Sequence, residues 1–303
     1  MIGPLASVCI GAYNRKDYIR ECVDSALAQT WPNKEIVVVD DASTDGTREI
    51  LQSYGDSIRL ILRDANSGVC SVTRNEAAAV AKGKYVALLD SDDVWYPEKL
   101  AKQVAFLEAN PSVPLCHTLC HVIDERSRVI GVRQSQDVVP PTGMIFERLL
   151  EHCWVTISTV MVRKSLFDEV GWFNPAAPYG YMGEDHEFFL RVARRHPIGL
   201  VPEVLAAFRK AGQGITAKNW MANPEPVPLF QALLGRKDIW AGVVPRSRMV
   251  RALTDKCSEN AYFFRNLKQW DRVAWFAKQA LKVNPLDVRA WRHWAAAAIR
   301  RSA

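Results

Sequence analysis

Three carboxylates stand within four residues at Asp90-Ser91-Asp92-Asp93, directly after an apolar run at 85–89. Carboxylates this close repel one another, so a site that keeps them ionised usually supplies a cation. Oxygen ligands suit Mg²⁺ or Mn²⁺, which one or two carboxylates typically bind together with substrate phosphates. The cluster therefore predicts a divalent-cation site, with a solvated acidic turn as the alternative.

A second acidic pair, Asp40-Asp41, follows the β-branched run at 35–39 and precedes a turn rich in Ser, Thr, Asp and Gly at 42–47. Two carboxylates at this position can accept hydrogen bonds from a nucleotide base or ribose. The same residue types also cap helices, because Ser43, Thr44 and Asp45 are good N-cap residues. The pair alone leaves both interpretations open.

A third pair, Glu184-Asp185, precedes an apolar helical pattern that begins at residue 188. The helix dipole stabilises carboxylates at this end, which is a purely structural interpretation. If Asp185 faces an acceptor hydroxyl, however, it can act as a general base.

Short apolar segments alternate with helical patterns over residues 7–93, and this alternation predicts βαβ units on a parallel sheet buried on both faces. Ligands bind beyond the carboxyl ends of the strands in such sheets. We therefore expect the first two acidic segments to end two neighbouring strands. The expected strands are 7–10, 35–39, 59–62 and 84–89, and the expected helices are 18–29, 45–53 and 71–81.

The pattern after residue 100 is mixed, and a Pro-rich stretch at 223–228 marks a boundary. We expect a catalytic domain over 1–216 and a helical region over 217–303. One tetratricopeptide-like spacing occurs at 266–285, but stacked repeats need about three units for stability. A helical tail that packs on the catalytic domain is therefore favoured. The mixed part is expected to hold helices at 101–109 and 185–195 and strands at 115–123 and 158–162.

The composition is that of a folded globular chain, with 303 residues, 49% hydrophobic and 24% charged. The net charge of +6 includes no long run of like charges, so it does not indicate nucleic acid as a partner. Seven scattered cysteines without a secretory leader pattern predict reduced thiols and a cytoplasmic location. No apolar run approaches the roughly 20 residues that span a bilayer.

Basic residues crowd the C-terminal end at Arg289, Arg292, Arg300 and Arg301. A solvated basic helix face is the favoured interpretation, with peripheral contact to an anionic membrane surface as the alternative. The neighbouring apolar residues are expected to pack on Trp270, Trp275 or their neighbours rather than enter a bilayer. These apolar residues are Trp291, Trp294, Ala295, Ala298 and Ile299.

The segment 116–121, with two cysteines and two histidines, could suggest a metal or haem site. Its spacing is one residue too long for haem attachment, and alternate residues of a strand face opposite ways. A buried strand is the better prediction.

Five motifs together resemble the family 2 glycosyltransferases, in that family's order and over roughly residues 5–210. They are Ser7-Val8-Cys9-Ile10-Gly11-Ala12-Tyr13-Asn14-Arg15, Val39-Asp40-Asp41-Ala42-Ser43-Thr44-Asp45-Gly46-Thr47, Asn66-Ser67-Gly68 with Arg74-Asn75, Asp90-Ser91-Asp92-Asp93, and Glu184-Asp185.

The resemblance implies a GT-A fold, with a Rossmann-like α/β sheet that is mixed but mainly parallel, and a nucleoside-diphosphate-sugar donor, most simply a UDP-sugar. Asp92 corresponds to the direct metal ligand for Mn²⁺ or Mg²⁺, and Asp185 to the catalytic base. Arg209 corresponds to a basic position in a loop that closes over the donor, although Lys210 replaces the usual histidine. The other implied nucleotide-sugar contacts are Ala12 and Tyr13 at base and ribose, Asp41 at uracil, Arg74 at the diphosphate, Asp90 and Ser91 at the ribose, and Arg15, Asp40, Asn66, Gly68 and Glu184.

The implied reaction is a single displacement with inversion at the anomeric carbon. Asp185 takes the proton of an acceptor hydroxyl, while a cation at Asp92 and the Arg74 side chain stabilise the departing diphosphate. The expected acceptor is a saccharide or lipid-linked saccharide of surface polysaccharide biosynthesis. A nucleotidyltransferase and a non-catalytic saccharide-binding or scaffolding protein are the alternatives.

Overall fold

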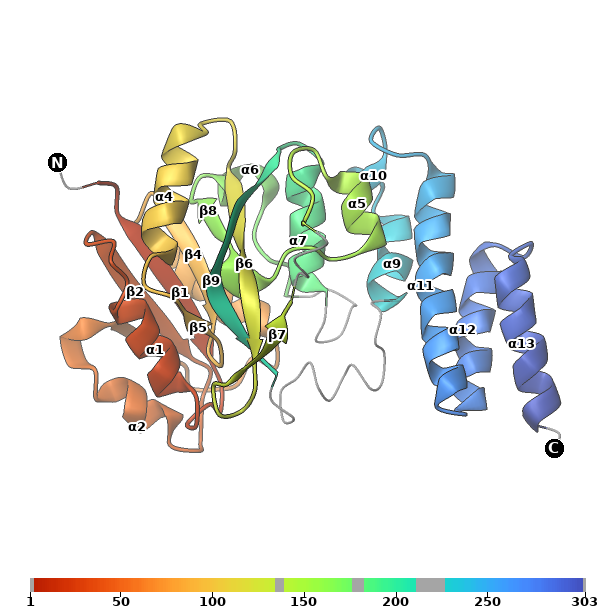
Figure 1. The fold of residues 1–303 in the computed structure, drawn as a ribbon, viewed down its shortest axis with the longest axis horizontal. Helices are drawn as coiled ribbons and strands as arrows, with labels where there is room; N and C mark the ends of the chain where they lie inside the picture. Colours follow the sequence, from red (N-terminus) through yellow and green to blue (C-terminus); the bar gives the residue numbers. More distant parts are fainter. Residues whose placement is uncertain (1–2, 134–138, 176–182, 211–226, 302–303) are drawn as a thin grey trace. The chain divides into compact units, whose positions relative to one another are not determined.

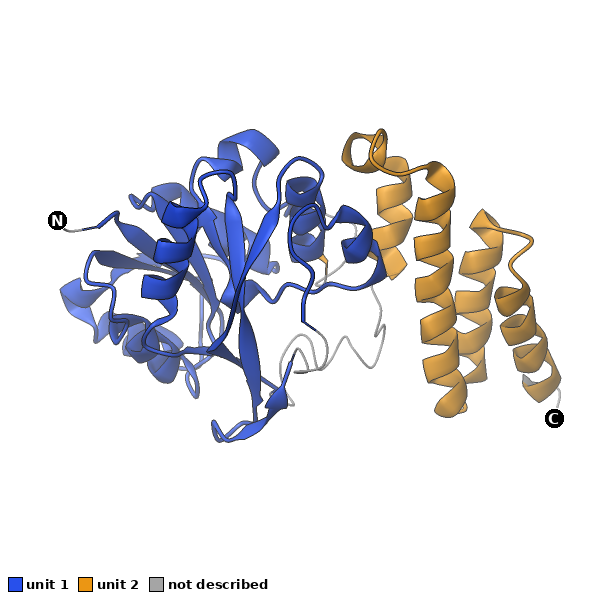
Figure 2. Cartoon of the chain, turned by 45° about the horizontal axis from the view of Figure 1, so that its top comes forward, with its two compact units in different colours: residues 1–176, 184–212 blue, residues 177–183, 213–303 orange. Residues whose placement is uncertain are grey.

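The computed structural model describes residues 3–133, 139–175, 183–210 and 227–301. The expected boundary at 216/217 lies outside the described residues. By their contacts, the residues divide into two compact units, residues 1–176 with 184–212 and residues 177–183 with 213–303 (Figure 2).

Unit 1 contains a nine-stranded sheet of the order β3-β2-β1-β4-β8-β6-β9-β5, with β7 paired to β6 (Figure 1). The first four of these strands run parallel, and β8 joins β4 in the antiparallel direction. The strands are β1 (Ala6–Ala12), β2 (Lys34–Asp40), β3 (Arg59–Leu62), β4 (Tyr85–Asp90), β5 (Val94–Trp95), β6 (Leu115–Ile123), β7 (Val129–Val132), β8 (Met161–Arg163) and β9 (Ile198–Arg209).

Helices accompany this sheet in unit 1, and the described residues of unit 2 form five helices. In unit 1 they are α1 (Ile19–Leu27), α2 (Thr47–Gln52), α3 (Cys70–Val80), α4 (Lys99–Ala109), α5 (Phe146–Glu151), α6 (Leu166–Val170), α7 (Glu184–Ala193) and the short 3₁₀ turns η1 (Gly55–Ser57) and η2 (Ile157–Thr159). In unit 2 they are α9 (Val227–Gly235), α10 (Lys237–Trp240), α11 (Arg246–Asn266), α12 (Trp270–Val283) and α13 (Val288–Arg301).

The α/β fold class and the order of elements over 7–93 are confirmed, and every expected strand there forms within two residues of its predicted bounds. Both faces of β1 are buried, as predicted for a parallel strand. Val8 and Ile10 belong to the core cluster that includes Ile19 and Val23 of α1. The alternate residues face α3.

Gly11 brings β1 and α3 into close contact. A Cβ atom at this position would lie 2.2 Å from Oγ1 of Thr73 and 2.9 Å from its Cβ. Only glycine therefore lets the carboxyl end of β1 approach α3 at this distance.

Two expectations about the sheet are corrected. The acidic segments do not end neighbouring strands, because β1 lies between β2 and β4. The segment predicted as a strand at 158–162 begins instead with the turn η2, and only Met161–Arg163 pairs as β8. The side chain of Ser158 explains this turn, since its oxygen bonds to the end of β4 rather than standing in a ladder.

The segment 116–121 forms part of β6, and both cysteines and His117 are buried, which confirms the buried-strand prediction. The helical character predicted beyond residue 226 is also confirmed. That the tail packs on the catalytic domain stays a prediction. No helix of the described residues has the length and apolar content to cross a bilayer.

Gly11→Ala should lower the free energy of unfolding by about 1–3 kcal/mol, because overpacking forces the strand or α3 to move. Chemical denaturation measures this change. Gly131→Ala on β7 is the matched control, because its added Cβ meets no heavy atom within 4 Å. Equal losses in the two variants would contradict the close contact between β1 and α3.

Candidate active site

The carboxyl ends of β2, β1 and β4 bring the candidate residues side by side. In the register of the sheet, Ala12 pairs with Asp40 and Gly11 pairs with Asp90. The chain runs from β1 outward to β2 and β3 and then returns to β4 on the other side of β1. The strand order therefore reverses between β1 and β4, which is the point where open α/β sheets bind ligands.

Arg74 of α3 joins the end of β4 to the start of α7. Its Nη2 lies 2.7 Å from Oδ1 of Asp90, and its Nη1 lies 2.6 Å from Oε1 of Glu184. Burial opposes the charge on Arg74, but the two carboxylates outweigh it and raise the pKa of the guanidinium well above its usual value. Arg74 therefore remains charged and holds two segments about 95 residues apart in sequence.

Asp92 lies beside Arg15, with 3.4 Å between Arg15 Nε and Asp92 Oδ2, and both side chains are 22% exposed. Burial raises the pKa of Asp92, and the charge on Asp90 adds to the rise, while Arg15 opposes it. A bound cation would stabilise the charged form of such a carboxyl group, because an opposite charge nearby favours ionisation.

A divalent cation fits this site if the phosphates of a nucleoside-diphosphate-sugar and waters supply most of its ligands. The described residues contain no group of three or more Asp, Glu, His or Cys side chains arranged to hold a metal. Mg²⁺ is nevertheless commonly bound by one or two carboxylates together with phosphates and waters. Asp92 is the partly exposed carboxylate that would serve as the protein ligand.

Asp93, unlike the neighbouring Asp92, is almost fully buried. Its Oδ2 accepts a hydrogen bond of 2.5 Å from Ser158 Oγ, and its Oδ1 accepts one of 2.7 Å from the Arg209 backbone N–H. Burial and the charges on Asp92 and Asp90 raise the pKa of Asp93 well above its usual value. Asp93 therefore links the acidic turn to η2 and β9, a structural role.

Ser158 also accepts a hydrogen bond of 3.0 Å from the backbone N–H of Asp90. The indole of Trp95 donates to the Ser158 carbonyl oxygen at 2.6 Å. Ser158 thus supports the acidic turn from a position about 65 residues later in the chain. Sequence reasoning missed this residue, because no local pattern connects a lone serine to so distant a turn.

Arg209 is the last residue of β9, and its side chain is 1% exposed. Its Nε donates to the Asp92 carbonyl oxygen at 2.7 Å, and its Nη2 lies 2.6 Å from Glu21 Oε2. Its Nη1 donates to the Asp124 carbonyl oxygen at 3.0 Å. Arg209 therefore lies in a strand and holds the backbone of Asp92 by a hydrogen bond. Its contact with the nucleotide-sugar stays a prediction.

The loop at Asn66-Ser67-Gly68 contacts Asp41 through several hydrogen bonds. Ser67 donates to its carboxylate through Oγ at 2.7 Å and through the backbone N–H, and Arg63 lies 2.9 Å from its Oδ1. Asn66 donates to the Asp41 carbonyl oxygen at 3.1 Å and accepts from the Gly68 N–H at 2.7 Å. The Asn66-Ser67-Gly68 motif therefore orients Asp41.

Asp40 is fully buried, and its Oδ2 accepts from the Ser43 backbone and forms an ion pair of 2.9 Å with Arg48. This arrangement supports the turn after β2. Nearby, the Tyr13 side chain is 43% exposed, whereas Ala12 and Ser91 are buried. Tyr13 is therefore the accessible ring at the end of β1.

Glu184 and Asp185 form the first turn of α7. Oδ1 of Asp185 accepts the backbone N–H of His186 at 2.7 Å. Burial raises the pKa of Asp185 above its ordinary value of 3.8; Arg74 opposes this rise and Asp90 adds to it. A carboxylate with a raised pKa is a better proton acceptor, which suits a general base.

The family model described as glycosyl transferase family 2 matches residues 7–171. Over 107 residues, the chain is 49% identical to a Bacillus subtilis (strain 168) protein named for teichuronic acid biosynthesis, the glycosyltransferase TuaG, with coverage of 34% of this chain and 42% of TuaG. Over 189 residues, it is 34% identical to an Escherichia coli protein named UDP-Glc:alpha-D-GlcNAc-diphosphoundecaprenol beta-1,3-glucosyltransferase WfaP, with coverage of 62% of this chain and 70% of WfaP. The chain belongs to glycosyltransferase family 2.

Two solved structures share the fold. S. aureus TarS 1–349 in complex with UDP-GlcNAc gives a TM-score of 0.66 at 20% identity and covers 96% of this chain and 88% of its own. A mannosyltransferase from Pyrobaculum calidifontis in complex with GDP-Man and Mn²⁺ gives 0.59 at 20% identity, with 99% and 86% covered. These likenesses confirm the GT-A fold predicted from the motifs. The chain spans less than half of the length of TuaG.

Ser158→Ala should destabilise the protein by about 1–3 kcal/mol, because it removes a donor from the buried Asp93 and an acceptor from the Asp90 backbone. Chemical denaturation at neutral pH measures the loss. Ser53→Ala is the control, since its hydroxyl donates to a carbonyl at the surface of α2 and should cost much less. A Ser158→Ala variant as stable as the control would show that the acidic turn does not depend on this serine.

Proposed function

We propose that this chain is an inverting glycosyltransferase that moves a sugar from a nucleoside-diphosphate-sugar, a UDP-sugar, to a hydroxyl of a saccharide or lipid-linked saccharide in surface polysaccharide biosynthesis. The observation that carries this proposal is the Arg74 bridge between Asp90 and Glu184. It joins the acidic turn, where a donor diphosphate and cation would bind, to the helix start that presents Asp185. The names of WfaP and TarS, each with a UDP-sugar, support the donor, and WfaP supports a lipid-linked acceptor.

In the proposed reaction, Asp185 accepts the proton of the acceptor hydroxyl as that oxygen attacks C1 of the sugar. A Mn²⁺ or Mg²⁺ ion bound by Asp92 would neutralise charge on the leaving diphosphate. Arg15 pairs with Asp92 and Arg74 pairs with Asp90, so both would add positive charge near the diphosphate. Asp41, oriented by Ser67 and Arg63, is the proposed partner of the base.

The remaining nucleotide-sugar contacts are proposed on the same basis. Tyr13 is accessible at the end of β1, whereas Asp40 and Arg209 support the turns that carry their neighbours. The proposed contact set comprises Ala12, Tyr13, Arg15, Asp40, Asp41, Asn66, Gly68, Arg74, Asp90, Ser91, Glu184 and Arg209.

We also propose a cytoplasmic location. All seven cysteines lie among the described residues, and no disulfide joins any of them there. Free thiols persist in reducing compartments. A nucleotidyltransferase is disfavoured by the family match, and a non-catalytic binding protein is tested by the variant that follows.

Asp185→Asn should lower turnover by a factor of about 10²–10⁴, because it removes the proton acceptor. UDP binding should remain, and stability at neutral pH should stay equal or rise. This follows because a carboxyl whose folded pKa is raised contributes its stability below the unfolded pKa and loses it as pH increases through the folded pKa. For the same reason, wild-type turnover should decline in acid from a pH above 3.8.

A sugar-nucleotide transfer assay and UDP calorimetry measure these two effects. Asp168→Asn, an exposed acid on α6, is the matched control and should leave both unchanged. If Asp185→Asn retained near-normal transfer with UDP still bound, Asp185 would not be the base. If the wild type transferred no sugar from any nucleotide donor while binding UDP, the non-catalytic alternative would gain support.

UDP with Mn²⁺ at 100 times its dissociation constant should add about 2.7 kcal/mol to the free energy of unfolding. Removing the cation with a chelator should reduce turnover more than nucleotide affinity, because the cation acts chiefly on the leaving group. Asp92→Asn should abolish the extra stabilisation against unfolding that Mn²⁺ gives in the presence of UDP. Asp17→Asn, which changes an exposed acid two residues after Arg15, should preserve it. The absence of any stabilisation by UDP with Mn²⁺ would contradict the donor site.

A further inference from the structure

The last described helix of unit 2, α13, exposes a continuous apolar face. Trp291 is 48% exposed, Trp294 37% and Ile299 70%, and Val288 before them is 62% exposed. The prediction that these side chains pack on Trp270, Trp275 or their neighbours stays a prediction, and it does not account for the part of their surface that is exposed. The two indoles contact each other edge to face, with 5.7 Å between ring centroids.

Helical geometry explains the exposure. Ala290 and Ala297, seven residues apart, are the fully buried positions of α13 and pack within unit 2. Their small side chains let α13 lie close against its neighbours. The tryptophans and Ile299 project from an adjacent face of the helix. The apolar residues of α13 therefore cover more of its circumference than the part that neighbouring helices bury.

The exposed indole of Trp291 has its polar group satisfied. Its Nε1 donates to the Pro285 carbonyl oxygen at 2.8 Å. The ring therefore combines a bonded polar edge with a bare apolar surface, the amphipathic form that tryptophan adopts at membrane interfaces.

The charge of this region is strongly basic. Residues 227–303 hold fifteen Lys or Arg and five Asp or Glu, whereas the remainder of the chain holds 24 and 28. All of the excess positive charge of the protein thus belongs to the helical part. No acidic residue occurs in α13, where Arg292 is exposed one turn after Val288 of the apolar face and Arg300 is exposed near the end of the helix.

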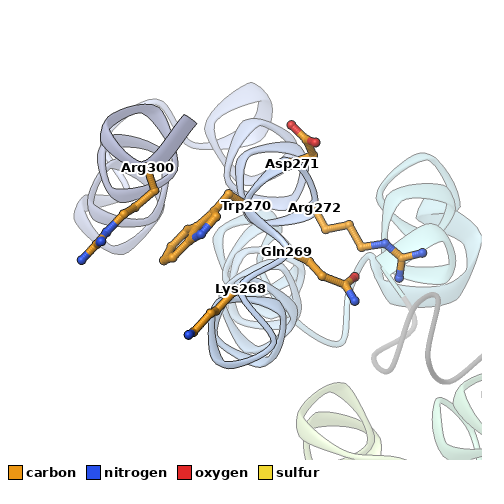
Figure 3. Close-up of a pocket in the computed structure, with 6 residues that line it drawn as sticks. All are labelled: Lys268, Gln269, Trp270, Asp271, Arg272 and Arg300. Atoms are coloured by element: carbon orange, nitrogen blue, oxygen red, sulfur yellow. The ribbon is translucent and has the colours of Figure 1, made fainter. Parts of the chain in front are cut away.

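A shallow cavity of about 410 Å³ lies next to α13 and is also basic. Its lining includes Lys268, Trp270 and Arg300, and Figure 3 shows these three side chains on the same side, with the Trp270 ring between the two cationic chains. Gln269 and Arg272 point in the other direction. The cationic groups of Lys268 and Arg300 can bind a phosphate group beside the Trp270 ring.

We propose that α13 docks on an anionic lipid bilayer, with Trp291, Trp294 and Ile299 entering the interface and the neighbouring Arg292 meeting lipid phosphates. Apolar and cationic side chains on one helix are the features that bind such surfaces. A second copy of the chain would bring the same excess of positive charge, which disfavours self-association through this face. The proposal goes beyond the proposed function, because it names a surface that exists with or without a sugar acceptor.

The test is co-sedimentation of the full chain with vesicles that contain no saccharide acceptor. The chain should bind vesicles of phosphatidylglycerol and phosphatidylcholine, and bind vesicles of phosphatidylcholine alone at least about tenfold less tightly, with strong weakening by salt. The double variant Trp291→Ser with Trp294→Ser should weaken binding at least about tenfold, and Arg292→Gln about fivefold.

Two matched controls separate this effect from a general change of surface. Ile130→Ser removes an equally exposed apolar side chain from β7, and Lys82→Gln removes an exposed charge after α3; both should bind like the wild type. Asp185→Asn should also bind normally, so failure of the catalytic proposal would not affect this result.

Three results would overturn the proposal. They are equal binding to both kinds of vesicle, no binding to anionic vesicles at low salt, and unchanged binding by the tryptophan and arginine variants. Light scattering after size exclusion provides a further readout, since a dimer that dissociates in the tryptophan variant would identify the face as a contact between copies.

Discussion

The structure depends on holding several carboxylates together at the end of β4 and the start of α7. Asp92, Asp93, Glu184 and Asp185 all have raised pKa values, and burial is the largest cause in each case. Desolvation and mutual repulsion both disfavour their charged forms. The native state therefore needs positive charge and hydrogen-bond donors at this position before any ligand arrives.

Three arginines provide that charge, and each does so from a different direction. Arg15 extends from the loop after β1, Arg74 from α3 and Arg209 from the end of β9. Arg74 and Arg209 are buried and fixed by several partners, whereas Arg15 and Asp92 form a longer, partly exposed pair. The arrangement is therefore rigid around the acidic turn and looser where a cation and diphosphate would enter. Such a division suits a site in which the protein positions its groups before the ligand binds.

The parts of this arrangement that local sequence determines could be predicted. The alternation of apolar segments and helical patterns was enough to predict the strands over 7–93. The carboxylates could be placed at strand ends because they directly follow those apolar segments in the chain. The partners of those carboxylates could not be found in this way. Ser158 meets the acidic turn, and Glu21 pairs with Arg209, only after the sheet has formed. The position of β1 between β2 and β4 likewise depends on how the strands pair. The exposed fraction of the apolar face of α13 could not be predicted for a related reason, since a helical pattern shows which residues share a face but not how much of it a neighbour covers.

The raised pKa values connect stability to function. Burial and mutual repulsion make the ionised forms of these carboxylates a cost to the folded state at neutral pH. The proposed cation at Asp92 would lower that cost at Asp92, and it would also reduce the repulsion that Asp92 exerts on Asp93, whose buried carboxylate links η2 to β9. Binding of the proposed cation would therefore be energetically coupled to the turn that Asp93 holds in place.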